Sequence, residues 1–245
     1  MSKAATLLYA VLAYAIFFAT FLYLIAFVGD LPFVPRTVDR GTEAPPAAAL
    51  ITNAALIALF GLQHSIMARQ GFKRTWTRIV PPQAERSTFV LFASFALIIL
   101  FLFWRPIDAV VWEVEAQAAQ TALWAMFGVG WSIVLLSTFL INHFELFGLQ
   151  QAYLYSRGRE AAPPQMREPF LYRYVRHPLY VGFFVAFWAT PQMTVGHLLL
   201  AAGMSVYMLI AIRYEERDLV GMFGRGYEDY QSRVGMLTPK IRRRT

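Results

Sequence analysis

The chain has 245 residues, of which 58% are hydrophobic and only 15% are charged, and it contains no cysteine. Soluble domains carry about a quarter charged residues, so this composition indicates a protein with much of its surface in lipid. The lack of cysteine excludes disulfides, thiolate-bound metals, iron–sulfur clusters and a cysteine nucleophile.

Uncharged apolar runs follow one another along the sequence. A helix needs about 20 such residues to cross the hydrocarbon core of a bilayer. The runs are Thr6–Val28, Ala47–Ala68, Ser87–Trp104, Gln120–Ile141 and Pro178–Ile212. The last run is too long for one crossing, and Thr190-Pro191-Gln192 near its middle predicts a hairpin whose first helix is short.

These runs predict an all-α, polytopic membrane protein with five to six transmembrane helices, a C-terminal helical hairpin and a cytoplasmic tail. No internal repeat interrupts the sequence, so we expect a single domain over residues 1–245.

Basic residues are unevenly shared between the two sides that six crossings would define. Of the 22 Lys and Arg residues, 19 fall in one set of segments, namely the N-terminus, 69–86, 142–177 and 213–245. Cytoplasmic loops are enriched in Lys and Arg, so we expect a multi-pass protein of the inner cell membrane with both termini in the cytoplasm. The net charge of +7 then reflects this bias, with "KIRRRT" at 240–245 meeting anionic lipid, and requires no nucleic-acid partner.

Four polar clusters fall on this expected cytoplasmic face. They are "GLQHSIMAR" at 61–69, "ERSTF" at 85–89, the stretch from "INHFEL" to "RHPLYVG" at 141–182, and "RYEERDLVGMFGRGYEDY" at 213–230. Each has a plain structural explanation, because arginines at span ends reach toward headgroups and Ser or Glu can cap a helix. Their convergence on one face favours a functional site.

The "RHPLYVG" stretch has the pattern of an anion site at the start of a helix. Pro178 suits the first helical position, and the N–H groups that follow it point out of the helix end. Arg176 and His177 add donors, and Gly182 allows close approach of a ligand or a neighbouring helix. The predicted hairpin brings Glu215 and Glu216 beside this stretch. There the two carboxylates either bind an ammonium or a ribose diol, or they form only surface ion pairs with nearby arginines.

"RHPLYVGF", "EERDL" and "GRGYEDYQSRV" together resemble the C-terminal signature of integral-membrane methyltransferases, which include isoprenylcysteine carboxyl and phospholipid N-methyltransferases. Together with "QHSIMAR", "ERSTFVL" and "LYRYVRHPLYVGFF", they resemble the bacterial methanethiol S-methyltransferases, neighbours of the NnrU-like proteins. This second resemblance extends from Gln63 onward.

The resemblance implies S-adenosylmethionine as methyl donor and a small apolar thiol as acceptor, with methanethiol converted to dimethyl sulfide. It implies a cofactor-binding part at roughly 142–240, with the donor held by Arg176, His177, Pro178, Leu179, Tyr180, Gly182, Glu215 and Glu216.

Methyl transfer to a thiol needs the thiolate, so a base or a stabilising cation is expected. The candidate catalytic residues are His143, His64, Arg86 and Tyr172, with His143 or His64 favoured as the base. No metal-ligand spacing occurs, so no metal site is predicted.

Two other functions stay open at this point. The acceptor could be a phospholipid amine or a prenylcysteine carboxylate. Alternatively, a haem-binding or nitrogen-oxide-related membrane protein would use His64 and His143 as axial ligands. The sequence leaves the oligomeric state and the identity of the base undecided.

Overall fold

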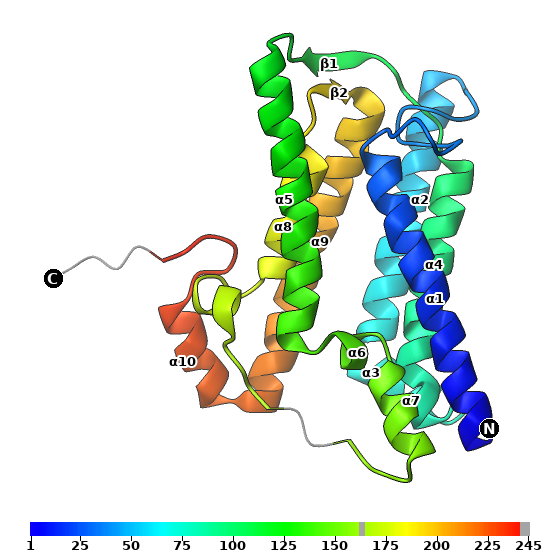
Figure 1. Ribbon diagram of the computed structural model, residues 1–245, viewed down its shortest axis with the longest axis vertical. Coiled ribbons are helices and arrows are strands. Elements are labelled where there is room, and N and C mark those ends of the chain that lie inside the picture. Colours follow the sequence, from blue (N-terminus) through cyan, green and yellow to red (C-terminus); the bar gives the residue numbers. More distant parts are fainter. Residues whose placement is uncertain (162–164, 241–245) are drawn as a thin grey trace, which may run out of the picture. The chain divides into compact units, whose positions relative to one another are not determined.

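The computed structural model describes residues 1–161 and 165–240, in which helices joined by loops make up the fold together with two short strands (Figure 1). The elements in chain order are α1 (Lys3–Val28), α2 (Pro46–Ala68), α3 (Gln70–Trp76), α4 (Pro82–Phe103), β1 (Val110–Glu113), α5 (Gln117–Ile141), α6 (His143–Leu146), α7 (Leu149–Ser156), the 3₁₀ helix η1 (Phe170–Arg173), α8 (Pro178–Trp188), β2 (Gln192–Thr194), α9 (Val195–Phe223) and α10 (Arg225–Arg233).

The predicted polytopic helical fold is confirmed. Within the described residues, five helices are long and apolar enough to cross a membrane, namely α1, α2, α4, α5 and α9. The predicted hairpin is present as α8 and α9, with its break at residues 189–194. Because α8 has only 11 residues, it is about 16 Å long, roughly half the thickness of the hydrocarbon core. Residues 241–245 of the basic "KIRRRT" tail lie outside the described residues.

Proline marks the start of three of these helices. Pro46, Pro82 and Pro178 occupy the first position of α2, α4 and α8. Proline has no N–H to lose there, and its fixed φ suits the first turn. In α1 the Ser2 side chain accepts a hydrogen bond from Ala5 N instead, as an ordinary N-cap does.

The described chain divides into two compact units, each built from separate segments. The first comprises Met1–Val114, His143–Ala162 and Pro191–Met204, and the second comprises Glu115–Asn142, Pro163–Thr190 and Ser205–Thr245. The single domain expected over 1–245 stays a prediction.

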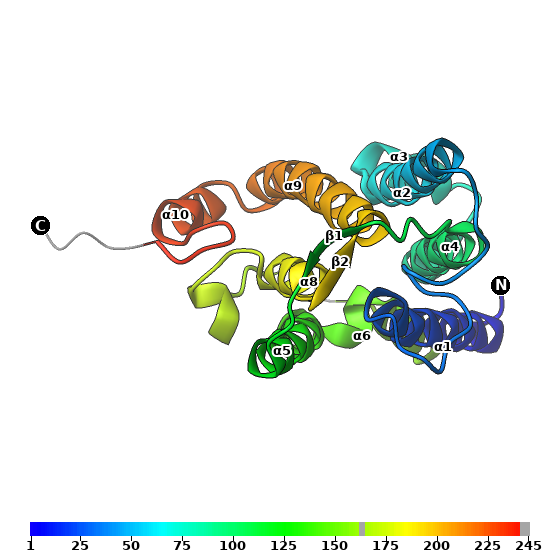
Figure 2. The same cartoon turned by 90° about the horizontal axis from the view of Figure 1, so that it is seen from above.

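In the first unit α4 packs between α1 and α2 (Figure 2), and α7 contacts α1 and α4. Asn53, which is fully buried in α2, binds the end of α4 by accepting from Arg105 N and donating to Arg105 O. This intramembrane amide is thus satisfied by main chain. The indole of buried Trp104 donates to Val38 O at 2.9 Å.

Three connections of the first unit meet at one end. β1, which follows α4, pairs antiparallel with β2, which precedes α9. Thr194 of β2 donates to the Asp39 carboxylate at 2.5 Å, so the loop after α1 joins the same end. In the predicted topology these three connections all lie outside the segments expected in the cytoplasm, and hence on the opposite side of the membrane.

The second unit is built on the contact of α5 with α8. A Cβ added at Gly182 would lie 2.7 Å from Gly130 O, and one added at Gly130 would lie 2.7 Å from Ala186 N. Such close backbone approach requires glycine on both helices. The Trp131 ring of α5 packs edge-on against Phe183 and Phe187 of α8.

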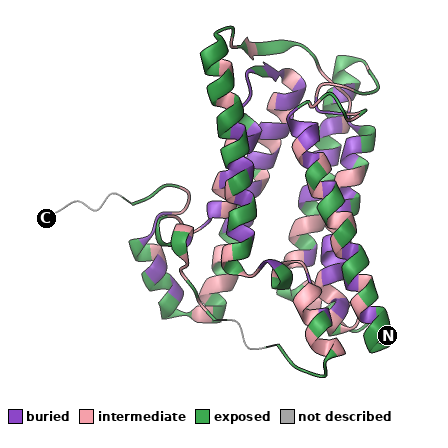
Figure 3. Cartoon of the chain, viewed as in Figure 1, coloured by how far each residue is buried: buried purple, intermediate pink, exposed green. Residues whose placement is uncertain are grey.

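Large apolar side chains point outward along the spans, where Figure 3 shows exposed residues alternating with buried ones. Leu12 of α1, Leu62 of α2 and Phe139 of α5 are each more than half exposed. Soluble proteins rarely expose contiguous surfaces of this kind, whereas a lipid-facing surface requires them.

Candidate functional site

The start of α8 carries a buried ionic network in the second unit. Arg176 Nε donates to Glu216 Oε1 at 2.7 Å, and His177 Nε2 lies 3.0 Å from the same oxygen. The Arg176 and Glu216 side chains are only 9% and 15% exposed, and His177 is buried. α9 runs eleven residues beyond the predicted end of its apolar run at Ile212, and this extension places Glu216 beside α8.

Glu215 takes a different partner from its neighbour. Its Oε2 accepts from the Tyr180 hydroxyl at 3.1 Å and lies 4.0 Å from His177 Nδ1. The two adjacent carboxylates therefore lie on either side of one imidazole. Glu215 is 46% exposed, so its carboxylate keeps a face on which a cationic or hydroxyl group could bind.

The end of α10 and the chain after it complete the network. Arg176 Nη1 donates to the carbonyls of Gln231 and Val234, and Gln231 Nε2 donates to Glu216 Oε2 at 2.9 Å. His177 N donates to Met236 O at 3.2 Å. Gln231 was missed as a site residue, although it lies within the "GRGYEDYQSRV" motif that carried the resemblance.

Tyr172 is a buried residue of η1, next to this network. Its carbonyl accepts from the Tyr230 hydroxyl at 2.5 Å. Burial, and after it the charge of Glu215, raises the pKa of the Tyr172 hydroxyl above its usual range. The phenol is therefore protonated at neutral pH and suits a hydrogen-bond donor rather than a base.

Three other residues of the predicted site occupy the start and first turns of α8. Pro178 is the first helical residue, and no side chain caps this helix end. Leu179 is half-buried in the first turn. Gly182 was predicted to admit a ligand or a neighbouring helix, and in the structure it admits the helix α5.

The remaining catalytic candidates belong to the first unit. His143 is buried at the start of α6, where its Nε2 lies 2.8 Å from the Tyr14 hydroxyl. Burial lowers the pKa of His143, which keeps the ring neutral at pH 7. It can therefore accept a proton.

Arg86 and His64 meet at Phe89. The Arg86 guanidinium lies 4.8 Å from the centre of the Phe89 ring, and its Nε donates to Leu146 O at 2.6 Å. The His64 ring packs edge-on against the same phenylalanine. Arg86 thus holds the last residue of α6, the short helix that begins at His143.

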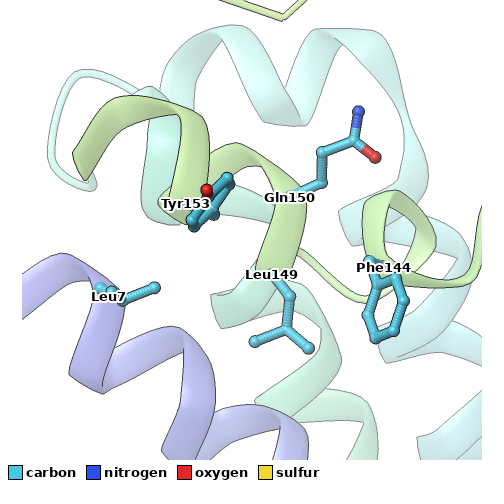
Figure 4. Close-up of a pocket in the computed structure, with 5 residues that line it drawn as sticks. All are labelled: Leu7, Phe144, Leu149, Gln150 and Tyr153. Atoms are coloured by element: carbon cyan, nitrogen blue, oxygen red, sulfur yellow. The ribbon is translucent and has the colours of Figure 1, made fainter. Parts of the chain in front are cut away.

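An apolar pocket of about 420 Å³ opens beside α6 in the first unit (Figure 4). Its lining residues are Leu7, Phe144, Leu149, Gln150 and Tyr153. Figure 4 shows the amide of Gln150 directed away from Leu149 and Phe144, so the wall near these two residues is apolar. Phe144 follows His143 directly in sequence.

Among residues 1–161 and 165–240, no three His, Asp or Glu side chains gather in a metal-binding group. The fold and the charged network together define a multi-pass helical membrane protein with a polar site at the start of a short apolar helix.

Curated relatives of the chain are methyltransferases. It is 52% identical over the full length of both chains to methanethiol S-methyltransferase of Mycobacterium tuberculosis. It is 52% identical to methanethiol S-methyltransferase 1 of Bradyrhizobium diazoefficiens, over 95% of this chain and 81% of that protein. A more distant relative is the nurim homolog of Drosophila pseudoobscura, 31% identical over 65% of this chain and 66% of that protein.

No protein-family model and no solved structure matches the chain. The identity of about half over the whole length nevertheless decides the relationship: the chain belongs to the methanethiol S-methyltransferase family and is a methyltransferase. The predicted resemblance is thereby confirmed.

Proposed function

We propose that this protein transfers the methyl group of S-adenosylmethionine to methanethiol, giving dimethyl sulfide and S-adenosylhomocysteine. The observation that carries the proposal is the Arg176–His177–Glu216 network with Glu215 and Tyr180 beside it, in a chain whose relatives are named for this thiol. The names of these relatives favour a thiol over a phospholipid amine, a prenylcysteine or haem.

The charged groups suit an amino-acid zwitterion such as the methionine part of the donor. The N–H groups at the start of α8 would hold its carboxylate, and His177, whose ring lies between Glu215 and Glu216, would position these two residues. The exposed face of Glu215 would take the ammonium or the ribose hydroxyls, with Tyr180 fixing that carboxylate. Arg176 is already engaged by Glu216 and two carbonyls, so we assign it to positioning Glu216.

When bound, S-adenosylmethionine supplies a methyl group on a positively charged sulfur. A bond forms between the thiol sulfur and the methyl carbon as the bond to the sulfonium breaks, and the bonding electrons stay on the departing sulfur. The thiol proton needs an acceptor, and we propose His143 for it, with His64 as the alternative. Holding the reactants in line and excluding water supplies several kcal/mol of catalysis.

We further propose that the protein lies in the inner membrane with both termini in the cytoplasm. Support comes from the 19 of 22 basic residues assigned to that side and from the meeting of the three opposite connections at one end of the first unit. The donor, which is charged, would then reach its site from the cytoplasm, and the apolar thiol from the membrane.

The test is methyl transfer by the purified protein, with dimethyl sulfide measured by gas chromatography and donor affinity by calorimetry. We expect product with methanethiol and none with phosphatidylethanolamine or a prenylcysteine. Glu215→Gln should weaken donor binding at least about tenfold, the equivalent of one lost interaction of about 1.4 kcal/mol.

Glu228→Gln is the matched control, because this substitution makes the same change of charge at an exposed residue of α10. If the protein binds S-adenosylmethionine but forms no product from methanethiol, the proposal that methanethiol is the acceptor is refuted. Unchanged donor affinity in Glu215→Gln would refute the assignment of the binding site.

A further inference from the structure

The second unit contains another pocket, which is polar and adjoins the Arg176 network at Val234. It has a volume of about 330 Å³ and is lined by Arg173, Tyr174, Arg233, Val234, Pro239 and Lys240. We call it the basic pocket. Its three cations come from three separate segments: the end of η1, the end of α10 and the chain that follows α10.

The cations of the basic pocket are held largely by main-chain oxygens. Lys240 Nζ donates to the carbonyls of Gln231 and Ser232, both at 2.8 Å. Arg173 Nε donates to Glu168 O at 3.2 Å. Carbonyls fix these side chains in position without neutralising their charge.

One carboxylate balances part of this charge. Glu168 Oε1 lies 2.9 Å from Arg233 Nη2, and no Asp or Glu is among the residues that line the pocket. Asp229 adds a more distant negative charge near Arg233, so the three cations against these two carboxylates leave a smaller excess of positive charge. Such an excess around a concave site is complementary to a phosphate, which carries one to two negative charges and several acceptor oxygens.

The basic pocket is joined to the proposed donor site by shared main-chain atoms. Gln231 O accepts from Lys240 Nζ and also from Arg176 Nη1. Val234, which lines the pocket, accepts from Arg176 through its carbonyl. Arg176 in turn holds Glu216. A ligand that draws Lys240 inward therefore acts on the segment that positions Glu216.

We propose that the basic pocket binds a phosphate group, from an anionic phospholipid headgroup or from a free phosphate, and that its occupation tightens binding of the methyl donor. The coupling rests on the proposed function, whereas the phosphate site does not. The exposed Tyr174 ring and Pro239 add an apolar wall, which favours the lipid as the source.

The first arm of the test measures binding of phosphatidylglycerol to the full-length protein by native mass spectrometry. We compare the unchanged protein with the double variant Arg173→Gln/Lys240→Gln. Each basic residue near an anionic headgroup contributes about fivefold to affinity, so the double variant should bind roughly 30-fold more weakly. Arg225→Gln, an exposed charge change on α10, should leave binding unchanged.

Arg173→Gln alone guards against misfolding of the double variant, because Arg173 is exposed and Lys240 then keeps its contacts with α10. It should show an intermediate loss of lipid. Equal lipid binding in the unchanged protein and both variants would overturn the site. Binding of inorganic phosphate or glycerol 3-phosphate in detergent, abolished by the same variants, would identify free phosphate as the source.

The second arm measures donor affinity in nanodiscs of phosphatidylcholine with and without phosphatidylglycerol. We expect tighter donor binding with the anionic lipid, and no such difference in the double variant. Loss of lipid binding without any change in donor affinity would overturn the coupling. The lipid arm reads out binding alone, so absence of methyl transfer would refute the proposed function and leave the phosphate site standing.

Discussion

At the scale of single residues, the adjacent carboxylates of α9 have different tasks. Glu216 is nearly buried and binds Arg176, His177 and Gln231. Glu215 is half exposed, accepts from Tyr180 and lies 4.0 Å from His177 Nδ1. A buried ion pair gives little net stability, but removing one partner strands the other at a cost of several kcal/mol. We therefore infer that Glu216 positions the residues of the site and that Glu215 contacts the ligand.

A second residue-scale feature is Asp39, which is largely buried at the end of the first unit where three connections meet. Burial raises the pKa of Asp39 to about 6. A raised pKa in the folded state means that the protonated acid is favoured by folding, so stability is lost as pH rises from about 4 through 6. Asp39→Asn should remove this loss and still accept from Thr194.

Thermal unfolding in detergent at several pH values measures this effect. Relative to the unchanged protein, Asp39→Asn should gain up to about 3 kcal/mol near neutral pH and nothing below about pH 4. Because other acids titrate equally in both proteins, only their difference is interpreted. A difference that does not vary with pH would contradict the shifted pKa.

At the scale of elements, hydropathy alone predicted the long helices. The run Thr6–Val28 became α1, Gln120–Ile141 became the main part of α5, and the Pro191 break separated α8 from α9. The strand pair was not predicted, because β1 and β2 have four and three residues and lie about eighty residues apart in the chain. Pairing at that separation depends on where the helices end, which local patterns do not specify.

The contact of α5 with α8 gives a prediction about packing. A methyl group at Gly182 would meet the main chain of Gly130 and Val134, which cannot move aside as a flexible side chain can. Gly182→Ala should therefore lower stability by about 1–3 kcal/mol. Gly128→Ala is the matched control on α5, because a Cβ there meets nothing within 4 Å and alanine favours helix.

Thermal unfolding and donor affinity separate the two explanations considered for Gly182. Packing predicts a lower unfolding temperature for Gly182→Ala and none of this loss for Gly128→Ala. A direct donor contact would instead weaken donor binding in Gly182→Ala while its unfolding temperature stayed that of the unchanged protein, which would refute the packing role.

At the scale of the whole molecule, the prediction is a fixed orientation in the membrane. The chain has no cysteine, so each introduced cysteine is the only reactive thiol. Glu43→Cys lies in the loop after α1, and Asp229→Cys lies on α10; both positions are exposed. A membrane-impermeant maleimide should label Glu43→Cys in intact spheroplasts, and Asp229→Cys only after permeabilisation. The reverse pattern would invert the proposed topology.

The sequence predicted the polar partners of the site better than their arrangement. Arg176, His177, Tyr180 and the glutamate pair came from one motif and its resemblance, and the structure brings them together. The pairing of Arg176 with Glu216 was not foreseen, nor was the role of Gln231. Both depend on how α10 and the chain after it fold back onto the start of α8, which local sequence patterns do not specify.

The length of α8 also has a consequence for biosynthesis. An apolar stretch of 11 residues is too short to be inserted into the bilayer as an independent span, so α8 has to enter together with α9 as one hairpin. By then α5 has already been translated, and its Gly130 surface is available to receive Gly182. Docking of α8 on α5 is thus a late step of assembly in the second unit, and the proposed donor site is complete only when α10 and the chain after it have also folded onto the start of α8.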